Sequence, residues 1–441
     1  MKKVTLNKEV DVKKEVDVIV CGGGPAGIGA AIAAARQGMD VALIESRSFL
    51  GGNITACYVE SCNYFLWQGP FEVTGLYKEL EEEYRREFGN SDDIRTDFSP
   101  HRFSSEYLKI FLDKKIEEEG IWLRLHSRVA DVILDGDKIK GVIIDSKSGL
   151  EGILGEVVID CTGDADVAAA AGVPFEQGRE EDGLTQPGTV NFRVAGVDSE
   201  RVKKILDEKG IDYFYDIYNR KVAEGVIDMG YKRMNFPMGR LTAGGQVSYI
   251  NFCNVYRIDP TDADDLTRAE MLARKRVLQF FNFIREHLPG FEKAELASIA
   301  PAMGFRDSRR IKGEYRLTAE DIDAERFFED TIAIYPRFYD MLSPTGTWDD
   351  LVYIVDLDKE YGIPYRSLLP VNVEQLLVAG RCISTDHLAE SSIRAISACM
   401  ATGQAAGTAA AIAVRENTGV KDVDVGKVQE ALRVAGVRLP D

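Results

Sequence analysis

A glycine cluster near the N-terminus, in the segment CGGGPAGIGAA, has the residue types and the spacing needed to bind a dinucleotide. Gly22 permits a tight turn, Gly24 lets the backbone approach a pyrophosphate, and Gly27 lets a helix lie close to the strand before it. Amide groups at the start of that helix, near Pro25 and Ala26, face the phosphates in such sites. The pattern therefore predicts a phosphate-binding turn between a strand and a helix.

The flanking sequence supplies the elements that this turn needs. The β-branched run Val18–Val20 predicts a buried strand, and an Ala-rich helix follows the glycines. A second predicted strand, Val41–Ile44, ends at Glu45, eighteen residues after Gly27, where a carboxylate can accept hydrogen bonds from an adenosine ribose. The alternative is a glycine turn that binds nothing. It is disfavoured because strand, helix, second strand and acid are all in register.

Three arginines beside a glycine are candidates for anion binding. Arg306, Arg309 and Arg310 could hold a carboxylate or a phosphate through bidentate hydrogen bonds. An ion-paired network is an equally good interpretation in a chain with 72 acidic residues. We expect no metal site, because the sequence has no CxxC, no HExxH and no His/Cys cluster.

Size and composition limit the class of protein. A chain of 441 residues exceeds one typical core, so we expect two domains. A net charge of −18 argues against nucleic acid or an anionic membrane as the main partner. Seven scattered cysteines and the lack of an apolar signal-peptide core indicate a reducing cytoplasm. Polar residues interrupt the Ala-rich stretch 395–414, which predicts a helix packed inside the protein rather than a membrane span.

The rest of the chain divides by its hydrophobic period. Residues 121–161 predict a β-meander that starts with one strand within 121–134 and runs into Gly163 and Asp164, where a carboxylate can meet a sugar-like hydroxyl chain. Between about 176 and 364, extended runs alternate with helices, one of them at 264–288. A strand at 376–379 and a long helix from about residue 393 then predict a return to the first domain.

Four blocks of this sequence together resemble the FAD-dependent oxidoreductases of the glutathione-reductase-like flavoprotein superfamily, which includes the fumarate reductase and succinate dehydrogenase flavoproteins. They are CGGGPAGIGAA with Glu45, LGG (50–52), DCTGDAD (160–166) and LLVAGRCISTDHLAESSIRAISACMATGQAAGTAAA (376–411). A segment like GFRDSRRIKGEYRLTAEDI also occurs in a bacterial branch of these proteins. The resemblance covers most of residues 16–175 and 295–415 and is weak between them.

The resemblance implies an α/β fold: a Rossmann-type FAD/NAD(P)-binding domain with a β-meander, interrupted by an inserted α+β substrate domain. We expect residues 1–175 and 365–441 to form the FAD domain and residues 176–364 to form the substrate domain. The FAD is expected to be non-covalent, because the flavin-linking histidine of the family has no counterpart near Asn53 to Thr55.

The resemblance also implies which residues contact FAD. The expected contacts with the two phosphates, the ribose and adenine come from Gly22, Gly24, Pro25, Ala26, Gly27, Glu45, Gly51, Gly52, Asn53 and the backbone of Val129. Those with the ribitol and the flavin come from Gly163, Asp164, Gly380, Arg381, Ser392 and Ile393, the last two at the entry of the final helix. Relatives commonly have Asp, bound to ribitol or phosphate, where this chain has Arg381, so an ion pair with phosphate is the alternative there.

Flavin carries out the redox step, so the protein must orient a substrate and move a proton. His387 lies in the loop expected beside the flavin and is the first candidate for acid and base work. Arg306 and Arg309 are the candidates for holding a carboxylate substrate. We therefore expect an enzyme that transfers a hydride between a small organic substrate and FAD. No second nucleotide motif is present to bind nicotinamide, so electrons are expected to pass to or from an external carrier or oxygen.

Two alternatives remain open. Cys57 and Cys62 have the spacing of the redox-active pair of glutathione-reductase-type enzymes, which would make a dithiol flavin reductase. The pair starts three residues later than in those relatives, and the surrounding residues differ, so two packed thiols are the simpler interpretation. The other alternative is a non-enzymatic binding protein on this fold, as in the prenylated-GTPase escort proteins.

Overall fold

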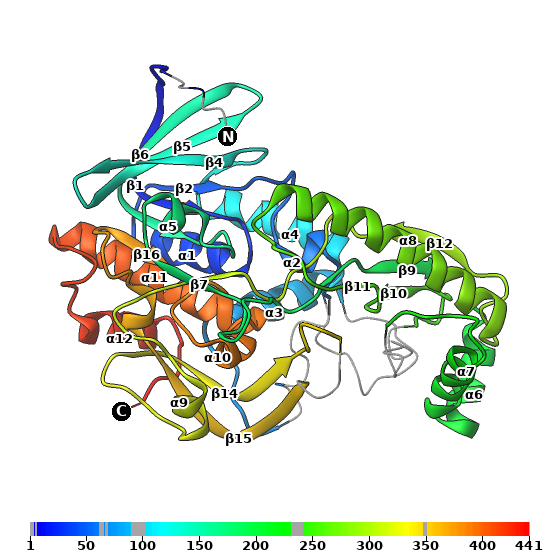
Figure 1. Cartoon of the computed structure of the whole chain (residues 1–441). Coiled ribbons are helices and arrows are strands. Elements are labelled where there is room, and N and C mark those ends of the chain that lie inside the picture. The colour runs from blue at the N-terminus through cyan, green and yellow to red at the C-terminus, as the bar shows by residue number, and fades with distance from the viewer. Residues whose placement is uncertain are drawn as a thin grey trace.

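A computed structural model gives the fold of the chain (Figure 1). The residues that it describes are 4, 7–60, 66, 69–89, 103–230, 241–346 and 351–440. A seven-stranded sheet lies at the centre of the nucleotide-binding region, with the order β3-β2-β1-β6-β5-β4 and β16 paired with β6. Its parallel strands are β1 (Val12–Cys21), β2 (Val41–Ile44), β3 (Trp122–Arg124), β6 (Gly149–Asp160) and β16 (Leu376–Val378).

The meander is built from strands that follow one another in the chain. β4 (Arg128–Asp135), β5 (Lys138–Ser146) and β6 pair antiparallel in that order. The expected α/β fold with a Rossmann-type sheet and a β-meander is therefore confirmed. The single strand expected within 121–134 is wrong, because Trp122–Arg124 pairs with β2 and His126, at φ 53°, separates it from β4.

The helices of this region cover the sheet. α1 (Pro25–Arg36) connects β1 to β2 and is mostly buried. α11 (Ile396–Glu416) crosses it so closely that a Cβ on Gly403 would lie 2.0 Å from the Ala26 carbonyl oxygen. The prediction of a buried Ala-rich helix is confirmed. Further helices are α2 (Asn53–Ala56), α3 (Gly75–Phe88), α4 (Ser105–Glu118), α5 (Asp166–Ala170) and α12 (Val425–Val434).

The final helix is not continuous from residue 393. α10 (His387–Ile393) is a separate short helix. The backbone of Ala395, with ψ 141°, is not helical and separates α10 from α11. Ser392 and Ile393 therefore lie in the last turn of α10 and not at the entry of the long helix. Asp386 explains where α10 starts, since its carboxylate accepts a hydrogen bond from the Ala389 amide at 2.7 Å.

The middle of the chain forms a second group of elements, which extends to the right in Figure 1. It has its own core of buried residues, almost all from 190–303. Its elements are β9 (Phe192–Ala195), β10 (Val247–Ile250), β12 (Glu295–Ile299), α6 (Ser199–Lys209), α7 (Asp212–Ala223) and α8 (Ala263–His287). The helix expected at 264–288 is thus confirmed.

Short paired strands and one longer pair of strands make up the rest of the described chain. The hairpin of β14 (Thr331–Met341) and β15 (Val352–Pro364) packs into the same core as the central sheet. The division of the chain at residues 175 and 365 stays a prediction. The remaining elements are β7 (Phe175–Gln177), β8 (Gly188–Thr189), β11 (Asn254–Val255), β13 (Arg309–Ile311), α9 (Ala319–Asp323) and the 3₁₀ helix η4 (Tyr365–Leu368).

Candidate active site

The first glycine turn has the backbone geometry of a phosphate cradle. Gly22 has φ 106°, and a Cβ there would lie 2.4 Å from the Cys161 carbonyl oxygen. A Cβ on Gly27 would lie 1.7 Å from the Gly22 carbonyl oxygen, so neither position accepts a side chain. At Gly24 the nearest atom of the described residues to an added Cβ is the Gly52 Cα, at 3.8 Å. The start of α1 is therefore open on this side, as a bound pyrophosphate requires.

A second glycine loop and an acid complete the cradle. The Gly51 amide donates a hydrogen bond to the Gly23 carbonyl oxygen at 2.8 Å, and Gly52 adopts φ 55° against Gly24. Glu45 is 5% exposed, and its carboxylate accepts hydrogen bonds from the amides of Gly23 and Arg47, both at 2.7 Å. Glu45 thus lies at the end of β2 against the glycine turn.

Arg381 joins three loops at the edge of the cradle. Its Nε donates to the Gly163 carbonyl oxygen at 2.8 Å, its guanidinium lies 2.5 Å from the Asp164 carboxylate, and it also bonds the Phe305 carbonyl oxygen. The Ser308 hydroxyl donates to the same Asp164 oxygen at 2.6 Å. Burial acts to lower the pKa of Arg381, but the carboxylates around it, Asp164 first, raise the pKa above its usual value. Arg381 therefore stays charged and fixes the loops.

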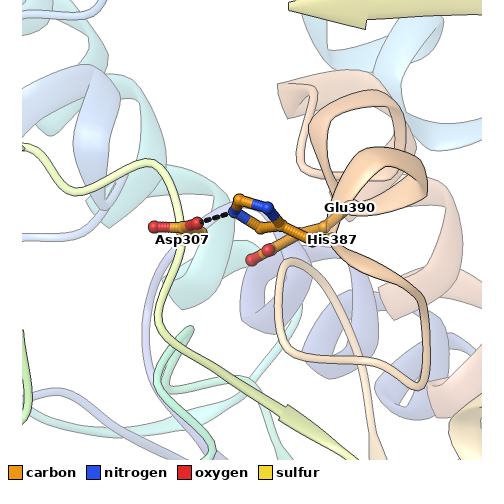
Figure 2. Close-up of side chains that lie close together, drawn as sticks. All are labelled: Asp307, His387 and Glu390. Atoms are coloured by element: carbon orange, nitrogen blue, oxygen red, sulfur yellow. Dashed lines mark hydrogen bonds and ion pairs between the residues drawn. The ribbon is translucent and has the colours of Figure 1, made fainter. Parts of the chain in front are cut away.

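A histidine and two acids meet beside these loops (Figure 2). The Nε2 of His387, the first residue of α10, lies 2.5 Å from Oδ2 of Asp307. Asp307 is fully buried, and its other oxygen accepts a hydrogen bond from the backbone amide of Gln186 at 2.8 Å. The His387 side chain keeps 13% of its surface exposed. The pair therefore has a fixed acid inside and an imidazole that reaches solvent.

Glu390 lies one helical turn after His387 on the same side of α10. Its carboxylate is fully buried and pairs with Arg310 at 3.1 Å, while its Oε1 has no hydrogen-bond partner among the described residues. Burial raises the pKa of Glu390 to about 8; Arg310 opposes this shift and Asp307 adds to it. One carboxylate oxygen is thus left buried and unsatisfied next to the Asp307 and His387 pair.

Comparison with known families decides what kind of protein this is. A family model described as FAD dependent oxidoreductase matches residues 17–432. The chain belongs to the FAD-dependent oxidoreductase family. It is a flavin-dependent enzyme with FAD as its cofactor, as the resemblance predicted. A comparison with curated protein sequences found no match.

Several solved structures are similar to this chain at low identity. A geranylgeranyl bacteriochlorophyll reductase-like protein from Thermoplasma acidophilum is 12% identical, with a TM-score of 0.45 over 96% of this chain and 83% of that chain. The myxobacterial halogenase CndH (12%, TM-score 0.49, 95% and 78%) and the p-nitrophenol 4-monooxygenase PnpA from Pseudomonas putida DLL-E4 (12%, 0.46, 95% and 84%) are similar to the same extent. These similarities are too distant to identify a reaction.

Other residues expected to contact FAD lie in or near this cradle or in strands beside it. Gly380 has φ 88°, and its amide donates to the Thr402 hydroxyl at 3.0 Å. Asn53 begins α2, and its side-chain amide donates to the Phe305 carbonyl oxygen at 3.4 Å. Val129 lies in β4 opposite Ile144. Their contacts with FAD stay predictions.

Ser392 and Ile393 are both packed into the protein. The Ser392 hydroxyl lies 2.8 Å from the Tyr361 hydroxyl, and Ile393 is fully buried. The amide groups that begin the long helix α11 belong instead to Ile396 and the residues that follow it. Flavin contacts from Ser392 and Ile393 therefore stay predictions without support from their position in α10.

The three arginines of the family segment reach different partners. Arg306 donates to the Pro187 carbonyl oxygen at 2.7 Å, and Arg309 pairs with Asp166 at 2.9 Å. Arg310 is buried and forms an ion pair with Glu390. Arg309 and Arg310 are neighbours in β13, where successive side chains point to opposite faces. Of the two interpretations of the sequence, ion pairing describes Arg309 and Arg310.

Cys57 is a poor candidate for a reactive thiol. It is fully buried, and its Sγ lies 3.3 Å from the Asn53 side-chain oxygen. Burial raises its pKa to about 11 even though Arg47 and Arg381 oppose the shift. Cys62 lies outside the described residues, so the dithiol alternative stays untested.

Two residues of the site, Asp307 and Glu390, were not expected from the sequence. The signal for Glu390 was present, because a histidine and a glutamate three residues apart lie on one face of a helix. Asp307 is 80 residues from His387 in the chain, and no local pattern connects them.

Proposed function

We propose that this enzyme transfers a hydride between a small organic substrate and non-covalently bound FAD, with His387 exchanging the accompanying proton. The observation that supports this most is the 2.5 Å contact between His387 and the buried Asp307. The segment around Asp307 also touches the cradle, because Ser308 bonds Asp164 and the Phe305 carbonyl accepts from Arg381. The proton-exchanging group is therefore tied to the loops expected around the cofactor.

The residues of the cradle fit FAD. The open backbone at Gly24 and the two glycine loops leave room for the pyrophosphate at the start of α1. FAD, when bound, supplies the hydride acceptor or donor. The chain itself must hold the substrate in line, exclude water and accept or deliver one proton.

Asp307 prepares His387 for that proton. Its carboxylate is anchored by the Gln186 amide and engages Nε2, which leaves Nδ1 as the ring nitrogen free to exchange a proton with a substrate. A buried carboxylate also stabilises the imidazolium that forms when the substrate loses its proton. Asp307 is thus a positioning residue, and His387 is the proposed catalytic residue.

Electrons are proposed to pass to or from an external carrier, since no nicotinamide-binding motif accompanies the cradle in the sequence. A cytoplasmic location is part of the same proposal and rests on composition. Among the described residues, no helix is both long and apolar enough to cross a membrane.

A substrate survey tests the proposed function. Purified FAD-loaded enzyme would be mixed anaerobically with hydroxy acids, amines, unsaturated acids and thiols while the flavin absorbance is recorded. Oxidised flavin should be bleached by at least one class of donors, or dithionite-reduced flavin reoxidised by an unsaturated acceptor. If no class changes the flavin in either direction, direct hydride transfer with a small substrate is wrong.

A further inference from the structure

The Asp307, His387 and Glu390 cluster has a second chemical capacity. We propose that these three side chains form a binding site for one divalent transition-metal ion, with Zn²⁺ as the typical occupant. Each residue offers one ligand atom, and the three atoms lie within 4.8 Å of one another. One imidazole nitrogen and two carboxylates form a ligand set that zinc and similar ions accept. The nitrogen disfavours Mg²⁺ and Ca²⁺, which prefer oxygen ligands.

An unsatisfied oxygen points to a missing partner at this place. Glu390 is fully buried, and within the described parts of the chain its Oε1 has no hydrogen-bond partner. Figure 2 shows its carboxylate beside the imidazole of His387, on the side of Asp307. Buried polar atoms without a partner are rare and costly, and a cation would satisfy this one.

The outer contacts of the two acids are those of metal ligands. The Gln186 amide holds the second oxygen of Asp307, and Arg310 holds Oε2 of Glu390. Such contacts fix the orientation of ligating carboxylates, with Oε1 of Glu390 left unbonded and Oδ2 of Asp307 facing His387. His387 and Glu390 are already aligned because they are three residues apart in α10.

The local charge also favours a cation. Asp307 and Glu390 bring two carboxylates, and Arg310 offsets one of them. The two other arginines that act on Glu390 are paired elsewhere, Arg381 with Asp164 and Arg394 with Asp340. Ligation requires Glu390 to be ionised, and its carboxylate and that of Asp307 then face one paired arginine, Arg310, in the cluster.

Metal binding needs only a small movement. Ligands of a tetrahedral ion lie about 3.3 Å apart, so the 2.5 Å contact of Asp307 with His387 must open by about 1 Å. Asp307 is buried and anchored, whereas the His387 side chain is 13% exposed, so the imidazole is the group that would move. An ion would therefore enter past the imidazole.

Occupancy would regulate the enzyme, and this consequence rests on the proposed function. Nε2 of His387 cannot bind a metal and keep its contact with Asp307 through a proton. A bound ion therefore replaces the shared proton and removes the arrangement that prepares His387. Binding of the metal ion would therefore inhibit the enzyme reversibly, to an extent set by the transition-metal concentration.

The test is a binding measurement that needs no substrate. FAD-loaded enzyme, freed of metal with EDTA and dialysed, would be titrated with Zn²⁺ by calorimetry and assayed for bound metal after gel filtration. We expect one ion per chain, and a loss of affinity of at least about 100-fold in His387→Gln and in Glu390→Gln. His287→Gln makes the same change at a histidine of α8 outside the cluster and should bind Zn²⁺ as the wild type does.

The outcomes separate the proposals. Bound FAD and circular dichroism verify that each variant is folded. If Glu390→Gln does not fold, the test rests on His387→Gln, which changes the more exposed residue. Equal Zn²⁺ binding by the wild type and both cluster variants, or no Zn²⁺ binding by the wild type, would overturn the metal site while leaving hydride transfer intact. Competition by Mg²⁺ at equal concentration would also contradict it. Tight Zn²⁺ binding without any flavin reaction would remove only the proposed function.

Discussion

At the scale of single residues, the site depends on acids whose surroundings are fixed. Asp307 has no exposed surface, and both of its oxygens are engaged, one by Gln186 and the other by His387. Glu390 is equally buried but keeps one oxygen free. Asp307 is therefore suited to orienting His387, and Glu390 is suited to binding a cation or a proton.

Asp307→Asn should slow the chemical step and leave substrate binding unchanged. The amide keeps the shape of the side chain but cannot stabilise an imidazolium, so the limiting rate of flavin reduction should fall about 10- to 100-fold. The substrate concentration for half the limiting rate should change less than about twofold. Stopped-flow measurements at several substrate concentrations separate the two quantities.

The matched control is Asp264→Asn at the start of α8, which should leave both quantities unchanged. If Asp307→Asn instead weakens substrate binding and keeps the limiting rate, Asp307 contacts the substrate and does not act through His387.

Asp160 gives a pH dependence of stability. It is fully buried at the end of β6, and burial raises its pKa to about 6, although hydrogen bonds from Ala168 and Thr162 favour its charged form. In the unfolded chain its pKa is about 3.9, so the folded state binds more protons between these values. Its contribution to stability is present below pH 4 and is lost as the pH rises through 6, by about 3 kcal/mol in total.

Urea unfolding of the wild type and Asp160→Asn at pH 4, 5, 6 and 7 measures this contribution. The variant cannot ionise, so the free energy of unfolding of the wild type should fall relative to the variant across this range. A difference that is constant with pH would show that the buried carboxyl does not titrate there.

At the scale of elements, backbone geometry at the ends of strands builds the cofactor cradle. Gly22 and Gly27 have no room for a side chain because protein atoms occupy the space, whereas the nearest described atom to a Cβ on Gly24 is 3.8 Å away. Local patterns were enough to predict β1, α1, β2 and α8. Each of them has a regular hydrophobic period or a clear stop.

Gly24→Ala should fold normally and lose affinity for FAD. Within the described part of the chain the added Cβ meets no atom closer than 3.8 Å, and it lies at the start of α1, where the pyrophosphate is expected. FAD affinity, measured by quenching of flavin fluorescence, should fall at least about tenfold.

Gly244→Ala is the control, because among the described residues a Cβ there meets only the Thr242 hydroxyl, also at 3.8 Å. Gly244 is also far from the glycine turn in the sequence. Wild-type FAD affinity in Gly24→Ala would place the cofactor elsewhere.

At the scale of the whole molecule, the site is assembled from segments far apart in the chain. The sequence predicted the nucleotide fold and His387, because glycines, strands and family blocks carry those signals locally. It did not predict the partners of His387 and Arg381, since Asp307, Asp164 and Phe305 reach them only after the chain has left the sheet and returned. It also missed the break between α10 and α11, which depends on Asp386 and the extended Ala395.

The central claim is that His387 exchanges the proton that accompanies hydride transfer to or from FAD. The most direct measurement is an anaerobic single-turnover comparison of the wild type and His387→Ala, both FAD-loaded, with a substrate from the survey. The account predicts a flavin reduction or reoxidation rate at least about 100-fold lower in the variant, with FAD still bound. Equal rates in the two proteins would contradict it.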